Sequence, residues 1–563
     1  MKNLVEQAKR EIRNGILSAV KKAQDADQLP KEAELPDFTV EIPADVKNGD
    51  FATNAAMVSA RVFKMPPVRI AAVLAEHFPL EDSMFASCSV AGPGFLNFVL
   101  APVWFSSVLQ AVFEEQENYG TTNLGEGKKI LVEFVSANPT GPMHIGNARG
   151  GALGDCLASV LSAAGYEVDR EFYVNDAGNQ IAKFGLSLDL RYQECCGLEI
   201  EMPEDSYHGQ DIVEHAKNFY AVHQDAYMSS DESERRAALV AFALPKNVQT
   251  LHDDLEKYRI TYDKWFYESE VHNNGEVARV ISLLKESGYT YEKDDALWFK
   301  AEQFGCEKDY VLIRSNGLPT YVVPDIAYHY NKLVTRGYDR AIDVLGADHH
   351  GYVPRLKAAL QALGVDPSRL DAVLMQMVRL VRDGEVVKAS KRSGKAITLA
   401  VLLDEVPIDA ARFYFNLREA NSHFDFDLDL AVEQSSQNPV YYVQYAHARI
   451  CSILKHLEEE GITPLPVSEE IFNLLREPEE LALIRHISLL PDEINDAAKD
   501  YDPSLMTKYL TDLATCFHKF YNACKCNCGE VSLTSARLYL CKATRQVLEN
   551  VLKMLKINAP EHM

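Results

Sequence analysis

The stretch from Ile130 to Asp155 constrains the fold more than any other part of the chain. It begins with an apolar run, 130–135, and continues as SANPTGPMHIGNARGGALGD, which contains Pro139 and Pro142. A proline disfavours the helical conformation in the residue before it and cannot donate a helical hydrogen bond. A helix can therefore begin only near His144 or Gly146. The stretch predicts a strand, an extended turn and a helix, the unit from which parallel α/β sheets are built.

The signals of strands and helices divide the chain into three regions, because its 563 residues exceed what one hydrophobic core can organise. Residues 1–110 contain an amphipathic helix, two helices separated by a Pro-Pro pair, and two strands around a Gly-Pro-Gly turn, which predicts an α+β domain. In residues 111–408 strand and helix signals alternate, as in an α/β domain with a parallel sheet. Beyond Asp409 strand signals vanish, so residues 409–563 are expected to form an all-α bundle.

Within the α/β region the apolar runs predict four strands and one insertion. The predicted strands are 130–135, 168–174, 341–345 and 374–381. Between the second and the third lies a long stretch of helical and polar character, about 183–300, which we interpret as an insertion in the sheet domain.

Composition and charge argue against several classes of protein. The formal net charge of −25 argues against indiscriminate nucleic-acid binding, although a specific RNA partner needs only local basic patches. No apolar run approaches the roughly 18 residues of a membrane helix, and the amphipathic N-terminus is unlike a signal peptide. We therefore expect a cytoplasmic protein with no membrane partner. The 11 cysteines are expected to be free thiols, and no structural metal is expected, because the spacing of one cluster is too tight for zinc: Cys524, Cys526 and Cys528.

One segment suited to a nucleotide is the turn and helix described above, although neither common phosphate-binding fingerprint is present. His144 and the N–H groups of Gly146 and Asn147 would lie at the carboxyl end of a strand, where α/β sheets bind ligands. An adenine ring could pack on the bare helix face formed by the glycines that follow, Gly150, Gly151 and Gly154. The alternative is that these glycines only permit close packing of the helix against the sheet.

The second segment is VRLVRDGEVVKASKRSGKAITL, which predicts a hairpin turning at Asp383 and Gly384. Between Arg379 and Lys395 six basic residues face two acidic ones, in a chain that is acidic overall. A charged run is often only a solvated face. The small residues between the lysines, and the helix signal after them, favour a mobile loop that closes on a polyphosphate.

These two segments, in this order, resemble the class I aminoacyl-tRNA synthetases: HIGN matches their HIGH motif and KASKR their KMSKS motif. The stretches EFVSANPTGPMHIGNARGGALGD, TYVVPDIAYHYNK, VLGADHHGY and DAARFYFNLR resemble the arginyl-tRNA synthetases, as do GDFATNAAM, VAGPGFLNF and NPVYYVQYAHARI. The resemblance covers nearly the whole chain. It implies a Rossmann-type catalytic domain, an N-terminal domain that contacts the tRNA elbow, and a helical anticodon-binding domain. It further implies a monomer whose partners are L-arginine, ATP with Mg²⁺ and tRNA(Arg).

The resemblance and the residue chemistry together give a set of candidate site residues. Catalysis is expected of His144, Asn147, Lys388 and Lys391. ATP binding is expected of His144, Gly146, Asn147, Gly150, Asp348, His349, Ser390 and Lys391. A guanidinium is a planar fork of donors that needs carboxylates, and by the resemblance arginine binding is expected of Glu133, Asn138, His144, Tyr321, Asp325 and His349. For tRNA binding the candidates are Asn54, by resemblance only, and the stacking and cationic residues Tyr441, Tyr445 and Arg449, although aromatic stripes are more often core.

Asn147 departs from the family pattern, since it replaces the last histidine of HIGH. An asparagine donates hydrogen bonds but carries no proton charge. It either donates to the phosphate in the transition state or caps the helix. Two other functions stay open for the whole chain: a carboxylate-activating ligase of the same superfamily that does not use tRNA, and a synthetase-like RNA-binding protein without catalysis.

Overall fold

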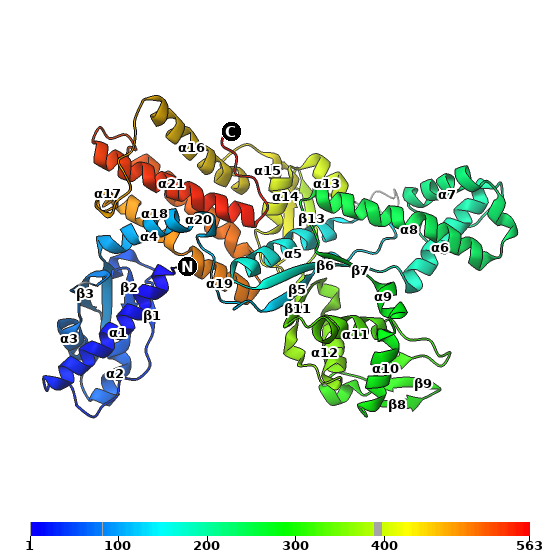
Figure 1. Cartoon of the computed structure of the whole chain (residues 1–563), viewed down its shortest axis with the longest axis horizontal. Helices are drawn as coiled ribbons and strands as arrows, with labels where there is room; N and C mark the ends of the chain where they lie inside the picture. The colour runs from blue at the N-terminus through cyan, green and yellow to red at the C-terminus, as the bar shows by residue number, and fades with distance from the viewer. Residues whose placement is uncertain (1, 82, 388–396) are drawn as a thin grey trace.

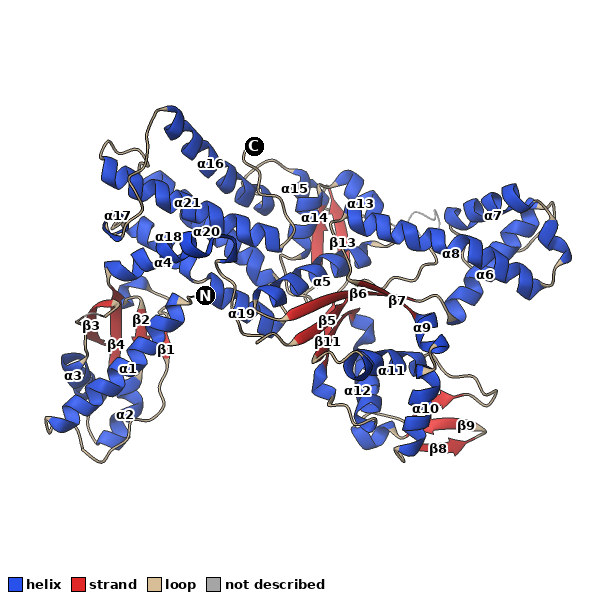
Figure 2. Ribbon diagram, in the orientation of Figure 1, coloured by secondary structure: helices blue, strands red, loops and turns tan. Residues whose placement is uncertain are grey.

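The computed structural model describes residues 2–81, 83–387 and 397–563. Lys388, Ser390 and Lys391, expected in the site, lie outside the described residues. The chain forms an N-terminal unit, a central α/β unit with two lobes, and a helical bundle, which Figures 1 and 2 show. No helix in the described part of the chain combines the length and apolar character needed to cross a bilayer.

The N-terminal unit is an antiparallel sheet of order β1-β2-β4-β3 covered by helices. Its strands are β1 (Val40–Glu41), β2 (Phe51–Thr53), β3 (Phe85–Ala91) and β4 (Phe95–Leu100), and its helices are α1 (Leu4–Asp25), α2 (Ala55–Phe63) and α3 (Pro67–His77). The Pro-Pro pair separates α2 from α3, as predicted, because Pro66 precedes a helix whose first residue is Pro67.

The central unit is built on a five-stranded sheet of order β12-β11-β5-β6-β7 in which all neighbouring pairs are parallel. The strands are β5 (Lys129–Glu133), β6 (Glu167–Val174), β7 (Lys264–Tyr267), β11 (Arg340–Gly346) and β12 (Leu370–Met375). The chain leaves the middle strand, β5, toward β6 and later returns on its other side at β11. The order therefore reverses at β5, and in open α/β sheets the crevice at such a switch point binds ligands.

The expectations for the strand 374–381 and for the region beyond Asp409 need correction. The predicted strand 374–381 is two strands of different sheets, because β12 ends at Met375 and Gln376 turns to bond Ala420. The stretch after it forms a small sheet of order β14-β13-β15 with β13 (Val378–Arg382), β14 (Glu385–Val386) and β15 (Phe424–Asp427). A strand thus lies beyond Asp409. The predicted hairpin is correct: Asp383 and Gly384 both have positive φ between β13 and β14.

The stretch 183–300 is not one insertion, because it contains β7, a strand of the central sheet. The four residues of β7 (Lys264–Tyr267) are too few to show the alternation of apolar and polar residues that is typical of a strand. One lobe precedes β7 and has its own core: α6 (Gly178–Cys195), α7 (Gln210–His223) and α8 (Glu232–Lys257). A second lobe follows: α9 (Glu268–Asn273), α10 (Glu276–Glu286), β8 (Thr290–Lys293), β9 (Ala296–Phe299), β10 (Tyr310–Ile313), α11 (Val322–Tyr330) and α12 (Val353–Ala362). The two lobes project separately in Figure 1.

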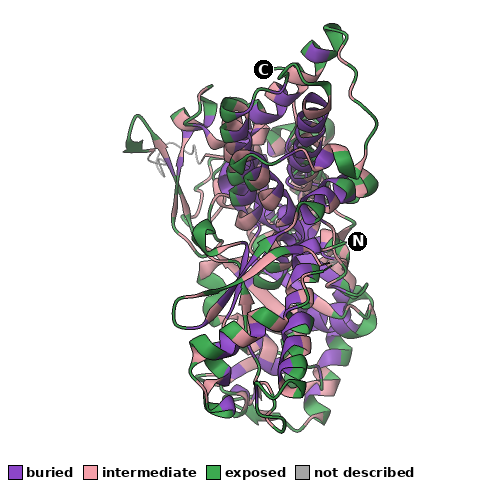
Figure 3. Cartoon of the chain, turned by 90° about the vertical axis from the view of Figure 1, so that its left-hand side faces the viewer, coloured by how far each residue is buried: buried purple, intermediate pink, exposed green. Residues whose placement is uncertain are grey.

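The C-terminal bundle is helical, and the apolar faces of its long helices are mostly buried (Figure 3). Its helices, with the connecting ones, are α13 (Leu399–Glu405), α14 (Ile408–Phe415), α15 (Leu428–Val432), α16 (Pro439–Glu459), α17 (Glu469–Phe472), α18 (Pro478–Ser488), α19 (Leu490–Asp500), α20 (Ser504–Ala523) and α21 (Val531–Met554). Along α21 and its C-cap, apolar residues at helical spacing are buried, namely Ala536, Leu540, Ala543, Val547, Val551 and Leu555. Helix α4 (Pro102–Glu115) leaves the N-terminal unit and packs against this bundle.

Candidate active site

The helix after β5, α5 (Ile145–Ala163), begins where the sequence predicts, with His144 as its N-cap. The amide oxygen of Asn147 accepts the backbone N–H of His144 at 3.0 Å. Asn147 therefore does cap the helix, and this bond commits its oxygen. Only its NH₂ group can face a ligand, so the capping role and the donor role are compatible.

Ile397 and Thr398, which follow the lysine-rich segment 388–395 (the lysine loop), lie beside this helix start. His144 and Thr398 form a β-bridge. The N–H of Leu399 bonds the carbonyl of Met143 at 2.9 Å, and the N–H of Ile145 bonds Ile397 at 3.2 Å. The two segments that the sequence singles out are about 240 residues apart in the chain, yet the backbone joins them at the carboxyl edge of the sheet.

The glycines of α5 divide into two kinds. A Cβ on Gly154 would overlap the Phe134 ring, and one on Gly151 would lie 2.7 Å from Ile260 Cδ1, so both are needed for close packing of the helix. A Cβ on Gly146 would meet nothing within 4 Å, and one on Gly150 would make an ordinary contact of 3.5 Å with Met375. The packing interpretation therefore holds for the first pair and does not account for the second.

Two adjoining cavities open at the end of β5, and both are lined by Asn138 and Gln180. The first, about 710 Å³, is lined by His144, Asn147 and Thr398, with Tyr207 and Asp211 from the lobe before β7. The second, about 1080 Å³, brings together five expected residues: Asn138, Tyr321, Asp325, Asp348 and His349. Gly146 and Gly150 line neither of them.

Asp325 is held rigidly at the wall of the larger cavity. One carboxylate oxygen lies 3.1 Å from His329 Nδ1, and the other accepts the hydroxyl of Tyr352. Burial alone would raise the pKa of Asp325, but His329 and Tyr352 outweigh it, and the pKa lies below its ordinary value. The Tyr352 ring stacks on Tyr321, with centroids 6.0 Å apart, and Tyr321 is 70% exposed. An ionised carboxylate thus faces the cavity beside an aromatic wall, which suits a guanidinium.

Glu133 is not at this wall. It is buried behind the cavity, where one oxygen pairs with Lys332 Nζ at 2.5 Å and the other accepts the Ser136 hydroxyl at 2.8 Å. Its pKa is raised, chiefly by burial. Glu133 therefore lines neither cavity, whereas the other residues expected to contact arginine line one or the other.

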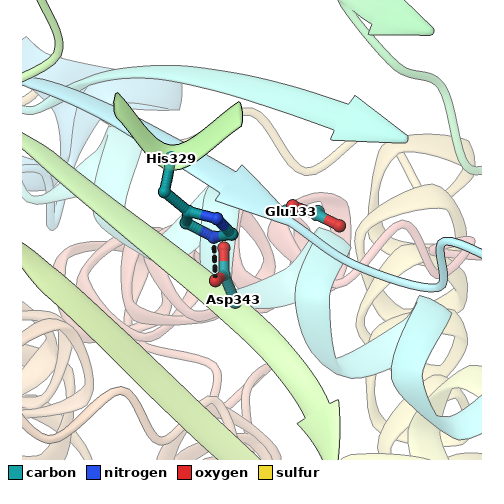
Figure 4. A group of neighbouring side chains, drawn as sticks. All are labelled: Glu133, His329 and Asp343. Atoms are coloured by element: carbon teal, nitrogen blue, oxygen red, sulfur yellow. Dashed lines mark hydrogen bonds and ion pairs between the residues drawn. The ribbon is translucent and has the colours of Figure 1, made fainter. Parts of the chain in front are cut away.

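Glu133, His329 and Asp343 converge closely enough to suggest a cation site (Figure 4). The ammonium of Lys332 already occupies that position: it lies 2.5 Å from Glu133, 2.9 Å from Asp343 and 3.4 Å from His329. No other group of three or more metal-binding side chains converges in the described ranges.

Sequence reasoning missed the residues around Asp325, namely His329, Lys332 and Tyr352. The spacing from Asp325 to His329 is one helical turn, and this i,i+4 relation was the one available signal. The pairing of Lys332 with Glu133 has no such signal, because 199 residues separate them.

The expected tRNA contacts form a partly exposed aromatic strip on α16. Tyr441 and Tyr445 stack with their centroids 6.2 Å apart. Arg449 lies over Tyr445 at 5.1 Å and over Tyr521 of α20 at 4.5 Å. Asn54 lies between β2 and α2, where its amide oxygen accepts the N–H of Thr39 at 2.9 Å. His518, which contacts Tyr445, and Tyr521 extend the strip beyond the predicted residues.

Three family models match the chain in succession. They are "Arginyl tRNA synthetase N terminal domain" over residues 10–100, "tRNA synthetases class I (R), catalytic domain" over 108–435, and "DALR anticodon binding domain" over 443–563. The arginine–tRNA ligases of Caldanaerobacter subterraneus subsp. tengcongensis and Ruminiclostridium cellulolyticum are 51% and 50% identical, each with 100% of both chains covered.

Solved structures give the same result. A putative arginyl-tRNA synthetase from Campylobacter jejuni matches with a TM-score of 0.74 and 33% identity over 82% of this chain and 100% of that one. The Thermus thermophilus arginyl-tRNA synthetase matches in fold with a TM-score of 0.73 and 22% identity, over 99% of this chain and 100% of that one. With relatives about half identical over its whole length, this chain belongs to the arginyl-tRNA synthetase family.

Proposed function

We propose that this arginine–tRNA ligase divides its small substrates between the two cavities, with arginine in the larger and the phosphates of MgATP at the start of α5. The observation that carries this proposal is the ionised Asp325, fixed by His329 and Tyr352 at the wall of a cavity that adjoins the helix N-terminus through Asn138. A guanidinium binds the carboxylate, and the free N–H groups of a helix N-terminus attract phosphate.

The roles of the residues follow from the charge that develops during activation. The arginine carboxylate attacks the α-phosphate in line, and negative charge grows on the phosphoryl oxygens and the departing pyrophosphate. We assign hydrogen bonds to these oxygens to His144 and the NH₂ group of Asn147, and contacts with the adenosine to Asp348 and His349. Lys391, aided by Lys388, neutralises the pyrophosphate, with Ser390 beside them; these three lie outside the described residues.

We assign tRNA to two distant regions of the chain: residues 1–110, with Asn54, to the elbow, and residues 409–563, with Tyr441, Tyr445 and Arg449, to the anticodon. Stacking on exposed rings beside a cation is how unpaired bases are bound. We also infer a cytoplasmic monomer, because the net charge of −25 opposes self-association and all 11 cysteines are free thiols. The alternatives without tRNA or without catalysis are not favoured, because the family models include an anticodon-binding domain and a catalytic domain.

The substitution Lys391→Ala tests the assignment of the lysine loop. We expect ATP–pyrophosphate exchange, measured with tRNA present, to fall by about 10²–10³-fold, the effect of losing one transition-state donor. Arginine binding, measured by calorimetry, should change little. An unchanged exchange rate would refute the role of Lys391, and Lys391→Arg, which keeps the charge, serves as the matched control.

A further inference from the structure

We propose that His329 is a positioning residue for arginine recognition: together with Asp343 and Lys332 it fixes the Asp325 carboxylate and sets the charge that the site presents. This inference rests on the proposed function, in which Asp325 binds the arginine side chain. It adds a buried relay, made of His329, Asp343, Lys332 and Glu133, that pairs with Asp325 and itself makes no contact with the substrate.

The first step is the protonation of His329. Its Nδ1 lies 2.9 Å from the backbone carbonyl of Asp325 and 3.1 Å from the carboxylate of that residue. Its Nε2 lies 2.7 Å from the Asp343 carboxylate, the contact drawn in Figure 4. A carbonyl and ionised carboxylates only accept hydrogen bonds, so both ring nitrogens must donate. A neutral imidazole has one N–H, and the geometry therefore requires the imidazolium.

The second step is the partner on the far side. Lys332 is fully buried, and its ammonium bonds Asp343 at 2.9 Å and Glu133 at 2.5 Å. Asp343 thus accepts from both cations and is the centre of the relay. Because every member is paired, the arrangement is rigid, and a buried charge left unpaired would be strongly unfavourable.

The third step is the balance of charge. Although burial raises the pKa of Glu133, its ion pair with the Lys332 ammonium at 2.5 Å favours the ionised form. Three carboxylates, those of Asp325, Asp343 and Glu133, then face two cations. The adjacent Glu171 is neutralised by its own partner, Arg336, at 2.5 Å. One negative charge is left uncompensated. Of the three carboxylates only Asp325 lines either of these two cavities. Asp325 and the relay together therefore carry one net negative charge, and it lies at the wall of the larger cavity. The positive charge of one arginine guanidinium balances it. Glu133 contributes from behind Lys332 and not by contact.

The experiment compares two neutral replacements of His329 that keep different halves of its contacts. The amide nitrogen of asparagine falls near Nδ1 and can still donate to Asp325, whereas that of glutamine falls near Nε2 and can donate only to Asp343. We expect His329→Gln to raise the aminoacylation KM for arginine about tenfold, as expected when one charge-assisted hydrogen bond is lost, and to leave the KM for ATP within about twofold. His329→Asn should raise the arginine KM less.

Two further measurements separate positioning from simple destabilisation. Thermal unfolding should show the two variants losing comparable stability, so that stability does not explain their different KM values. In an Asp325→Asn background His329→Gln should have no further effect on the arginine KM, because the residue acts through Asp325.

Equal effects of the two variants, a parallel rise in the KM for ATP, or full additivity with Asp325→Asn would each overturn the inference. Failure of the proposed function looks different: Asp325→Asn would itself leave the arginine KM unchanged. If Asp325→Asn raises the KM for arginine and His329→Gln does not, the proposed arginine site is supported and the proposed role of His329 is refuted.

Discussion

At the scale of single residues, Asn147 performs two tasks that separate substitutions can distinguish. Asn147→Asp keeps the oxygen that accepts the His144 N–H and adds a charge that suits a helix N-terminus, but it loses the NH₂ donor. We expect normal thermal stability and an aminoacylation kcat lowered by about 10²-fold. Asn147→Ala loses both groups and should also cost about 1 kcal/mol of unfolding free energy. A nearly normal kcat for the aspartate variant would show that the residue only caps the helix.

His329 gives a pH dependence whose direction follows from its partners. Burial and the neighbouring Lys332 lower its pKa, but Asp343 and Asp325 outweigh them and raise the pKa from 6.5 to about 10. A folded-state pKa above the unfolded one means that the stabilisation is complete below about pH 6.5 and is lost as the pH rises toward 10. The pKa values of Asp325 and Asp343 are lowered, so their contribution falls only in acid, below their ordinary 3.8.

Urea unfolding of the native enzyme and of His329→Gln checks this direction. We expect the difference in unfolding free energy between the two proteins to be largest near pH 6 and to shrink steadily by about pH 9.5. The charged and titratable groups around His329 are Asp325 and Lys332 on the same helical segment, Asp343 on β11 and Tyr328 beside its ring. None of these residues is substituted, so both proteins contain them. A difference that stays constant with pH would mean that His329 is not protonated in the fold.

At the scale of elements, the glycines of α5 make a matched pair. A methyl group on Gly154 would overlap the ring of Phe134, which directly follows β5, so Gly154→Ala must push α5 outward and should cost about 1–3 kcal/mol of stability. A methyl group on Gly146 meets nothing, so Gly146→Ala should not lower the melting temperature. It should raise the KM for ATP severalfold, because the space it fills is where we place the nucleotide. If the KM for ATP does not change, the nucleotide does not pack on Gly146.

The sequence predicts an element well when the residues that determine it lie within that element or next to it. The start of α5 and the break between α2 and α3 follow from prolines within a few residues, and the hairpin follows from Asp383 and Gly384. These predictions are correct because the determining residue lies in the element itself. Strand β7 was hidden in the stretch interpreted as an insertion, since its four residues are recognisable only by their pairing with β6.

The candidate site shows the same division. The stretch after β5, Asp325 and His349 carry local motifs, and the structure gathers most of their residues around two cavities. The state of Glu133 depends on Lys332, and the end of β12 depends on Arg149 of α5, which donates to the carbonyl of Gln376 at 2.7 Å. Neither Lys332 nor Arg149 is near its partner in the sequence. A buried charged residue produces no hydrophobic periodicity, so sequence patterns could not predict these contacts.

At the scale of the whole molecule, the polar contacts that the N-terminal unit makes with the rest of the described chain are with α4 and the bundle, not with the catalytic sheet. The nearly buried Asp50 pairs with Arg485 of α18, while its second oxygen accepts the N–H of Leu100 at 2.8 Å. Arg485 also lies over the Phe105 ring of α4 at 5.0 Å. Asp492 of α19 adds a bond from Asn3 at 2.5 Å. These contacts set the distance between the two surfaces that we assign to tRNA.

We therefore expect Arg485→Met to loosen this joint and to weaken tRNA binding without touching the active site. A ligand held at two places binds tightly only while the places keep their spacing, so the KM for tRNA should rise about three- to tenfold. The KM values for arginine and ATP should stay unchanged. Lys499→Met removes a positive charge from the same bundle, where its pair with Asp496 lies within one helix, and it should have little effect. Binding of an isolated anticodon stem–loop, which cannot reach the N-terminal unit, should be the same in the native enzyme and in Arg485→Met. Equal weakening of the stem–loop and of the full tRNA would mean that Arg485 acts at the anticodon surface, and the joint would then have no part in holding tRNA.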